Sequence, residues 1–176
     1  CVKEFTFPVE PFKVLIIDTA VTDVTCFGLS NGSIFAAGQS NGGSLLQPVT
    51  FTWTGTTVTP KDTLATSILD GVPAGTYIVT MQDADPAGCR VSDTIVVTQP
   101  TQLSVAQGRL QNETCRPGND GLASLKVSGG TKPYAYEWRL DTLLLTAQTD
   151  SLATGLRSGN YIITVIDSNQ CDTTFM

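Results

Sequence analysis

A twelve-residue segment occurs twice in the chain, as residues 72–83 and again as residues 156–167. Each copy contains an aliphatic residue, a Gly-containing turn, a Tyr and then a run of residues with high β-propensity. Alternation places Tyr77, Val79 and Met81 on one face of a predicted strand. The opposite face is not plainly polar, and this pattern is typical of a central strand in a sandwich rather than of an edge strand.

The two Tyr residues, Tyr77 and Tyr161, each follow an aliphatic residue by five positions, with a Gly between them. This spacing is typical of the tyrosine corner of immunoglobulin-like sandwiches, where the Tyr hydroxyl bonds back to upstream backbone. The sequence therefore predicts an all-β fold built from immunoglobulin-like β-sandwiches.

Other landmarks recur in the same order around the duplicated segment. Cys26 and Cys115 each precede a Gly by six residues, and a strand-like run ending in Trp follows each of them. Further strand-like runs begin at Cys89 and Cys171. A period of roughly 80–90 residues with a fixed order of landmarks indicates tandem repeats. We expect two sandwich repeats at residues 11–99 and 100–176, the second with a truncated last strand.

The first ten residues resemble the end of a repeat, because the segment begins with Cys, alternates like a strand and then reaches a Pro. We therefore expect residues 1–10 to be the last strand of a preceding repeat. The abrupt start at Cys1, with no visible signal peptide, is expected of an internal segment or a processed product.

Composition and charge exclude several classes of function. The net charge of −6 argues against nucleic-acid binding, which needs a basic surface. The longest aliphatic run, residues 14–17, is far too short to cross a bilayer. The chain contains no His, which excludes Ser-His-Asp and Cys-His catalysis and ordinary His-containing zinc sites. No pair of carboxylates is predicted to face across a cleft, so we expect that the protein is not an enzyme.

Two groups of side chains are candidates for ligand contacts. Acidic turns follow the duplicated segments and are candidates for a Ca²⁺ site, although ordinary Asx turns explain them more simply; their residues are Asp83, Asp85, Asp167 and Asn169. Otherwise we expect no cofactor. The second group is aromatic: Trp53 and Trp138 could form a carbohydrate-stacking platform, but their strand position is the core position of sandwich domains.

These landmarks together resemble the SprB repeat family. The shared pattern is Cys-x-Gly-x-x-(Asn/Asp)-Gly, then Gly-Gly-x-x-Pro-Tyr-x-Tyr-x-Trp, then Leu-x-x-Gly-x-Tyr followed by a strand, Asp and Cys. The second copy matches through residues 129–130, 133–138 and 156–171, whereas the first has an insertion around residues 39–47 and Val49 and Phe51 in place of two Tyr.

The resemblance implies a very large, repetitive cell-surface protein of Bacteroidota, exported by the type IX secretion system and associated with adhesion and gliding motility. We therefore expect an extracellular structural and adhesive module of a filament. Its expected partners are neighbouring repeats of the same chain, other chains in the filament and surface polysaccharide, without membrane insertion. The alternative is an accessory carbohydrate-binding module of a secreted glycan-degrading enzyme.

One tripeptide pattern is similar to the O-glycosylation motif of extracytoplasmic proteins of the same bacteria. Asp followed by Ser or Thr and then by a small or aliphatic residue, or Thr, occurs six times where about one occurrence is expected by chance. The alternative is that Asp-Thr simply suits turns and strand starts. The predicted acceptor residues are Thr19, Thr63, Thr94, Thr142, Ser151 and Thr173.

The family's extracellular location implies an oxidising environment and therefore paired cysteines. One option is a pair within each repeat, Cys26–Cys89 and Cys115–Cys171. In the inferred topology, however, such partners lie at opposite ends of a strand about 20 Å long, whereas a disulfide needs Cα atoms within about 7 Å. A bond between repeats, Cys26–Cys171, avoids this separation and is preferred. It would restrict the angle between the repeats.

Overall fold

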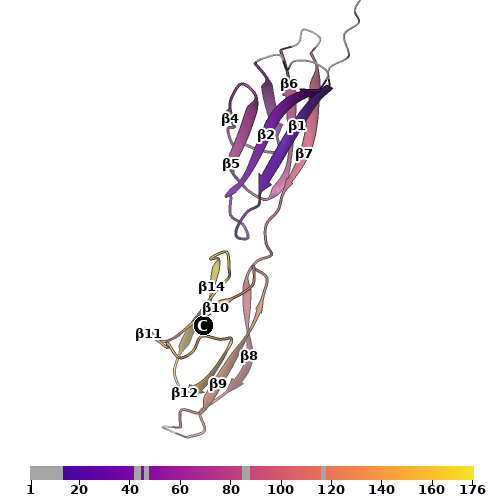
Figure 1. The fold of residues 1–176 in the computed structure, drawn as a ribbon. Helices are drawn as coiled ribbons and strands as arrows, with labels where there is room; N and C mark the ends of the chain where they lie inside the picture. The colour runs from indigo at the N-terminus through magenta and orange to yellow at the C-terminus, as the bar shows by residue number, and fades with distance from the viewer. Residues whose placement is uncertain (1–13, 42–44, 46–47, 85–87, 116–117) are drawn as a thin grey trace, which may run out of the picture. The chain divides into compact units, whose positions relative to one another are not determined.

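The computed structural model describes residues 14–41, 45, 48–84, 88–115 and 118–176. Strands form all the regular structure of this part of the chain, and it contains no helix that could cross a membrane. The chain divides into two compact units (Figure 1). The first extends to Val24 and resumes over Ser30–Thr98, and the second comprises Thr25–Leu29 and Gln99–Met176. Residues 1–10, predicted to be a strand of a preceding repeat, lie outside the described residues.

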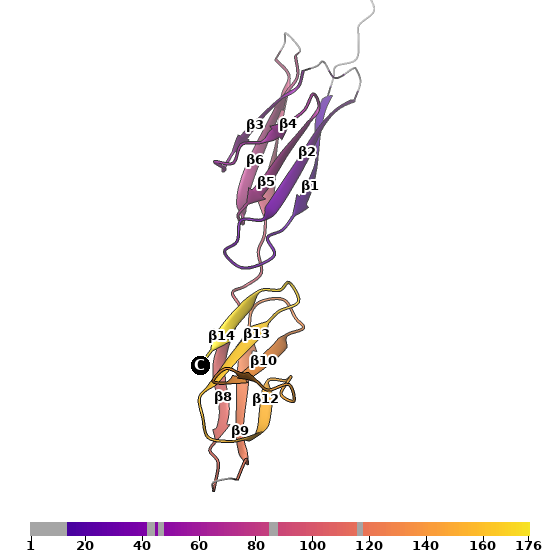
Figure 2. The same cartoon turned by 90° about the vertical axis from the view of Figure 1, so that its left-hand side faces the viewer.

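The first unit is a sandwich of two antiparallel sheets (Figures 1 and 2). One sheet has the order β1-β2-β5-β4 and the other has the order β3-β6-β7. This is the ABED/CFG arrangement of constant-type immunoglobulin domains. The strands are β1 (Val14–Thr22), β2 (Gly32–Asn41), β3 (Thr50–Thr54), β4 (Lys61–Asp62), β5 (Thr66–Val72), β6 (Gly75–Gln82) and β7 (Arg90–Val97).

The core of the first unit lies between the inward faces of these sheets. Tyr77, Val79 and Met81 of β6 are buried, as alternation predicted, and they pack with Ile34 of β2 and Leu69 of β5. Strand β6 is central, with β3 on one side and β7 on the other. The predicted position of the duplicated segment is therefore correct.

The second unit repeats this plan with one change. Its sheets have the orders β12-β9-β8 and β11-β10-β13-β14, and β13 is again central. The strands are β8 (Ser104–Gln111), β9 (Gly121–Ser128), β10 (Ala135–Leu140), β11 (Leu143–Leu144), β12 (Leu152–Leu156), β13 (Tyr161–Ile166) and β14 (Asp172–Phe175). The buried residues Trp138, Ala153, Leu156, Ile163 and Val165 form its core.

The fourth strand joins a different sheet in each unit. In the second unit β11 pairs with β10, because Leu140 and Leu143 face each other across a two-residue turn. Asp141 in this turn has a left-handed backbone conformation, with φ 53°, which Asp tolerates better than most residues. In the first unit β4 instead pairs with β5, the next strand in the chain. Local turn geometry thus decides which sheet gains the fourth strand.

Candidate functional site

A disulfide links Cys26 to Cys171 within the second unit, with a Cα–Cα distance of 5.7 Å. Cys26 belongs to the segment between β1 and β2, which the sequence assigned to the first repeat. The structure instead places residues 25–29 in the second unit. In this segment Asn169 Nδ2 donates to the Thr25 carbonyl oxygen at 2.9 Å. The backbone N–H of Gly28 donates to Gln99 Oε1 at 2.7 Å.

The turn that carries Cys171 is organised by Asp167, which is only 2% exposed. Its Oδ1 accepts the backbone N–H groups of Asn169 at 2.8 Å and of Cys171 at 2.9 Å. Its Oδ2 accepts the N–H of Thr131 at 2.8 Å. Gln170, immediately before the cysteine, has φ 65°. The carboxylate therefore holds the backbone in the conformation that presents Cys171 to Cys26.

Two of the four residues predicted as calcium ligands, Asp167 and Asn169, instead have structural roles in this turn. Both oxygens of Asp167 accept backbone N–H groups, and the side-chain amide of Asn169 binds Thr25. Asp83 is buried at the corresponding place in the first unit, whereas Asp85 lies outside the described residues. The part of the chain that the structure describes contains no cluster of three or more metal-ligating side chains.

The remaining described cysteines, Cys89 and Cys115, carry free thiols. The within-repeat pairs Cys26–Cys89 and Cys115–Cys171 are therefore not formed, and the bond present is the one preferred from the sequence. Cys89 is half-buried against the core of the first unit, while Cys115 is exposed on the second.

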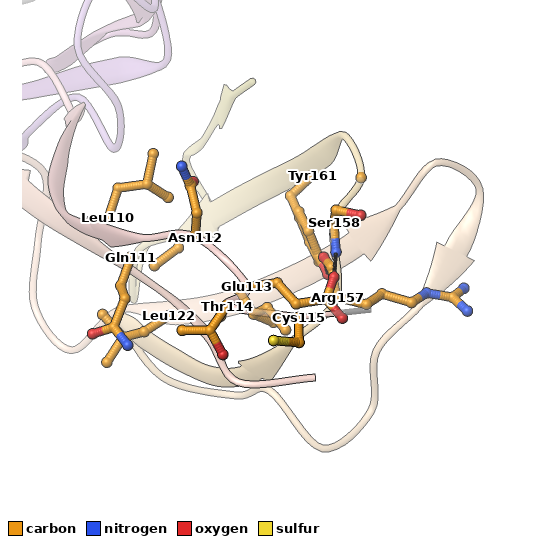
Figure 3. A pocket seen from close by; sticks show the side chains of 14 residues that line it. Leu110, Gln111, Asn112, Glu113, Thr114, Cys115, Leu122, Arg157, Ser158 and Tyr161 are labelled. Atoms are coloured by element: carbon orange, nitrogen blue, oxygen red, sulfur yellow. Dashed lines mark hydrogen bonds between the residues drawn. The ribbon is translucent and has the colours of Figure 1, made fainter. Parts of the chain in front are cut away.

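A pocket of about 530 Å³ adjoins Cys115 in the second unit (Figure 3). Its wall comes from the end of β8, the loop that follows it, the start of β9 and the turn before β13. Leu110, Leu122 and Tyr161 supply apolar surface, and Glu113 and Ser158 supply polar groups.

Glu113 fastens this loop to the rest of the second unit. Its Oε1 accepts the backbone N–H groups of Gly118 at 2.7 Å and Asn119 at 3.1 Å, and its Oε2 accepts that of Ser158 at 3.0 Å. Hydrogen bonds from Asn119, Ser158 and Gly118 lower the pKa of Glu113 below its ordinary value of 4.5. The carboxylate is thus an ionised structural brace, and its oxygens are occupied by backbone donors.

A second carboxylate organises the same loop. The hydroxyl of Thr114 and its backbone N–H both donate to Asp120, and together they lower the pKa of that carboxyl. Cys115 is therefore adjacent to a residue whose backbone is fixed. The roles of Glu113 and Asp120 were not predicted from the sequence, although both residues lie near the Cys-to-Gly landmark.

Trp53 and Trp138 do not form an exposed stacking surface. Trp138 is fully buried, and its Nε1 donates to the Asp150 carbonyl oxygen at 2.9 Å. Trp53 is half-buried, with Nε1 donating to Ser67 Oγ at 2.8 Å. The hydroxyls of Tyr77 and Tyr161 donate to backbone carbonyl oxygens four residues upstream, at 2.7 and 2.8 Å, as the tyrosine-corner spacing predicted.

The predicted acceptors for O-glycans fall into two groups. Thr19, Thr63, Thr94 and Thr142 are exposed, whereas Ser151 and Thr173 are half-buried. Thr19 donates to Asp93 at 3.5 Å, and Thr63 shares a hydrogen bond with Thr66 at 2.7 Å. The exposed group is therefore the part of the prediction that is sterically accessible.

Comparison with known proteins identifies the repeat. Residues 19–58 and 109–139 match the model of the SprB repeat, so the resemblance drawn from the sequence motifs is confirmed. Both matched regions begin within the first strand of a unit, β1 or β8, and the first ends just beyond β3 while the second ends within β10. No curated protein sequence matches the chain.

A solved structure with some similarity is the C-terminal 282-residue fragment of intimin in complex with the intimin-binding domain of the translocated intimin receptor. The identity is 21%, the TM-score is 0.42, and the match covers 90% of this chain and 61% of that fragment. The chain thus spans less than two thirds of the fragment, and we draw no functional conclusion from this similarity.

Proposed function

Because two stretches of the chain match the SprB repeat, we propose that it is a structural and adhesive module of a large cell-surface protein. The observation that carries this proposal is the occurrence of two matched repeats, each folded as its own sandwich. Repetition of a rigid unit extends a protein away from the cell without requiring a new core for each increment of length. The module itself has no enzymatic role in this proposal.

The disulfide supports a mechanical function. Cys26 lies before β2 and Cys171 lies before β14, so the bond encloses 145 residues of the chain. Tension applied outside these two cysteines bypasses the covalently closed segment. The module therefore keeps most of its length folded under loads that open its peripheral strands.

The finer parts of the proposal are export by the type IX system, participation in gliding motility, and contact with surface polysaccharide. O-glycans on the exposed residues Thr19, Thr63, Thr94 and Thr142 would protect the module from proteases. Protein isolated from its own cells should then exceed the mass of the bare polypeptide by whole hexose-type increments.

Deletion of the repeat region in the source organism tests the function. Antibodies against the chain should label intact cells, and the deletion strain should lose attachment to surfaces and surface movement. Labelling only after cell lysis would contradict the surface location. Normal attachment and movement in a correctly exporting deletion strain would contradict the adhesive role.

A further inference from the structure

Cys115 occupies the same structural landmark as the disulfide-bonded Cys26. Each cysteine follows a Thr and precedes by six residues a Gly that begins the second strand of a sandwich, β2 or β9. Gly32 begins β2 and pairs with Val72, while Gly121 begins β9 and pairs with Leu156. Cys26 is half-buried and bonded, whereas its counterpart Cys115 is exposed and free.

Cys89 matches the other partner of the bond, Cys171, in the same way. Each immediately precedes the last strand of its unit, β7 or β14. Each also follows a residue with left-handed backbone, Gly88 with φ 70° and Gln170 with φ 65°. A buried Asp closes the preceding central strand in both units, Asp83 in the first and Asp167 in the second. Cys89 and Cys171 are both half-buried, so this degree of exposure is compatible with a disulfide.

We call the Cys26–Cys171 bond, with the two turns that carry it, a junction. The chain therefore contains one completed junction and two free cysteines, Cys115 and Cys89, each of which matches one partner of that bond. We propose that Cys115 forms a disulfide with the cysteine before the last strand of another SprB-type repeat. Cys89 correspondingly bonds the cysteine between the first two strands of a different repeat. This inference rests on the proposed role as a repeat in an array, and it does not depend on what that array adheres to.

The surroundings of Cys115 suit a protein partner. The cavity of about 530 Å³ beside it is lined by Leu110, Leu122, Leu156 and Tyr161, which offer apolar surface to an incoming loop. Glu113 binds the backbone N–H groups of Gly118 and Ser158, and Asp120 binds that of Thr114, so these three groups already have partners before another repeat binds. In the completed junction Asn169 Nδ2 binds the carbonyl oxygen before Cys26.

Bond formation proceeds by two thiol–disulfide exchanges with a small-molecule disulfide as the oxidant. The Cys115 thiolate attacks this disulfide, forms a mixed disulfide and releases one small thiolate. The thiolate of the partner cysteine then attacks the Cys115 sulfur and releases the second. Two protein thiols are oxidised, and the small-molecule disulfide is reduced to two thiols.

A tandem protein tests the proposal. Residues 1–170 of one copy are joined to the full chain of a second copy, so that the second copy's Cys1 replaces the first copy's Cys171 in sequence. After oxidation with glutathione disulfide, non-reducing peptide mapping should recover Cys115 of the first copy bonded to Cys89 of the second. The Cys26–Cys171 bond within the second copy verifies that oxidation is complete.

Two matched variants make the result specific. Cys115→Ser in the first copy should leave the second copy's Cys89 as a free thiol and preserve the Cys26–Cys171 bond. The second variant adds Thr142→Cys to Cys115→Ser in the first copy, which places a thiol on another exposed turn of the same unit. This thiol should not form a disulfide with Cys89 of the second copy. A free Cys115 in the fully oxidised tandem, or equal capture by Thr142→Cys, would overturn the proposed junction. Either outcome would leave the adhesive proposal intact, since deletion of the repeats in cells tests that proposal separately.

Discussion

At the scale of single residues, hydrogen bonds to backbone groups define the ends of the strands in both units. The hydroxyls of Tyr77 and Tyr161 bind carbonyl oxygens at the turns into the central strands β6 and β13. The carboxylates of Glu113 and Asp167 bind backbone N–H groups in loops that carry cysteines. These side chains satisfy polar groups that the sheets leave unpaired, and buried or semi-buried polar groups are costly without such partners.

Replacing the corner tyrosines tests this role in each unit separately. Tyr77→Phe removes the donor to the Pro73 carbonyl oxygen and should lower the free energy of unfolding of the first unit by about 1 kcal/mol. Tyr161→Phe should have a similar effect on the second unit alone. Urea unfolding followed by tryptophan fluorescence separates the two when the other Trp is replaced by Phe, because Trp53 alone then reports on the first unit and Trp138 alone on the second. Equal effects of one substitution on both units would contradict the assignment.

The pKa of Glu113 predicts a dependence of stability on pH in the second unit. Hydrogen bonds lower this pKa in the folded state, so the carboxylate stabilises the fold above its ordinary pKa of 4.5. That contribution is lost as the pH falls from about 4.5 through the lower folded-state pKa. Unfolding titrations between pH 3 and 7 should show a smaller loss of stability at acid pH for Glu113→Gln than for the unchanged protein. If the free energy of unfolding depends on pH in the same way in both proteins, the ionised Glu113 does not stabilise the second unit.

At the scale of elements, the Gly that begins the second strand of each unit sets the contact between two strands of one sheet. A Cβ on Gly121 would lie 2.6 Å from the Leu156 carbonyl oxygen, and one on Gly32 would lie 3.0 Å from that of Val72. The pairing register shifts beside this contact in both units. Gly thus recurs here because neighbouring backbone occupies the space that any larger residue needs.

Substitution of these glycines should weaken the sheets that they join. Gly121→Ala is expected to lower the free energy of unfolding of the second unit by about 1–3 kcal/mol, since the clash is with backbone. Gly75→Ala in β6 is the matched control, because its Cβ would meet its nearest atom at an ordinary 3.7 Å. The control should change stability by less than about 0.5 kcal/mol. Comparable losses in the two variants would show that close approach is not the reason for Gly.

At the scale of the whole molecule, the chain crosses between its two units more often than a string of separate domains requires. It leaves the first unit after Val24, returns at Ser30 and leaves it again after Thr98. The Cys26–Cys171 bond ties residues 25–29 covalently to the rest of the second unit. Reduction of this one bond should therefore affect the mechanical behaviour of the chain more than its secondary structure.

Single-molecule stretching from the chain ends measures this effect. The bond spans 145 residues, which correspond to about 500 Å of extended chain at about 3.5 Å per residue. The extension of the oxidised protein should be shorter by this length. A reducing agent or Cys171→Ser should restore the full extension. Cys115→Ser is the control and should extend like the unchanged oxidised protein. Full extension of the oxidised protein would show that the bond does not close this segment.

The sequence by itself determined the features that depend on short-range pattern. Alternation located the buried faces of β6 and β13, the Tyr spacing predicted both corner hydrogen bonds, and the repeated landmarks predicted two sandwiches. Such features depend on residues that are neighbours in one strand or turn, so their signal is present in a short segment of sequence.

Only the tertiary structure decided the features that depend on distant partners. It placed residues 25–29 in the second unit, gave Glu113 its contact with Ser158, and made Asp167 the organiser of the cysteine turn. It also left Trp53 half-buried while it buried Trp138 completely. These outcomes depend on which segments meet in space, and the energies of those contacts do not appear in the local pattern of either segment.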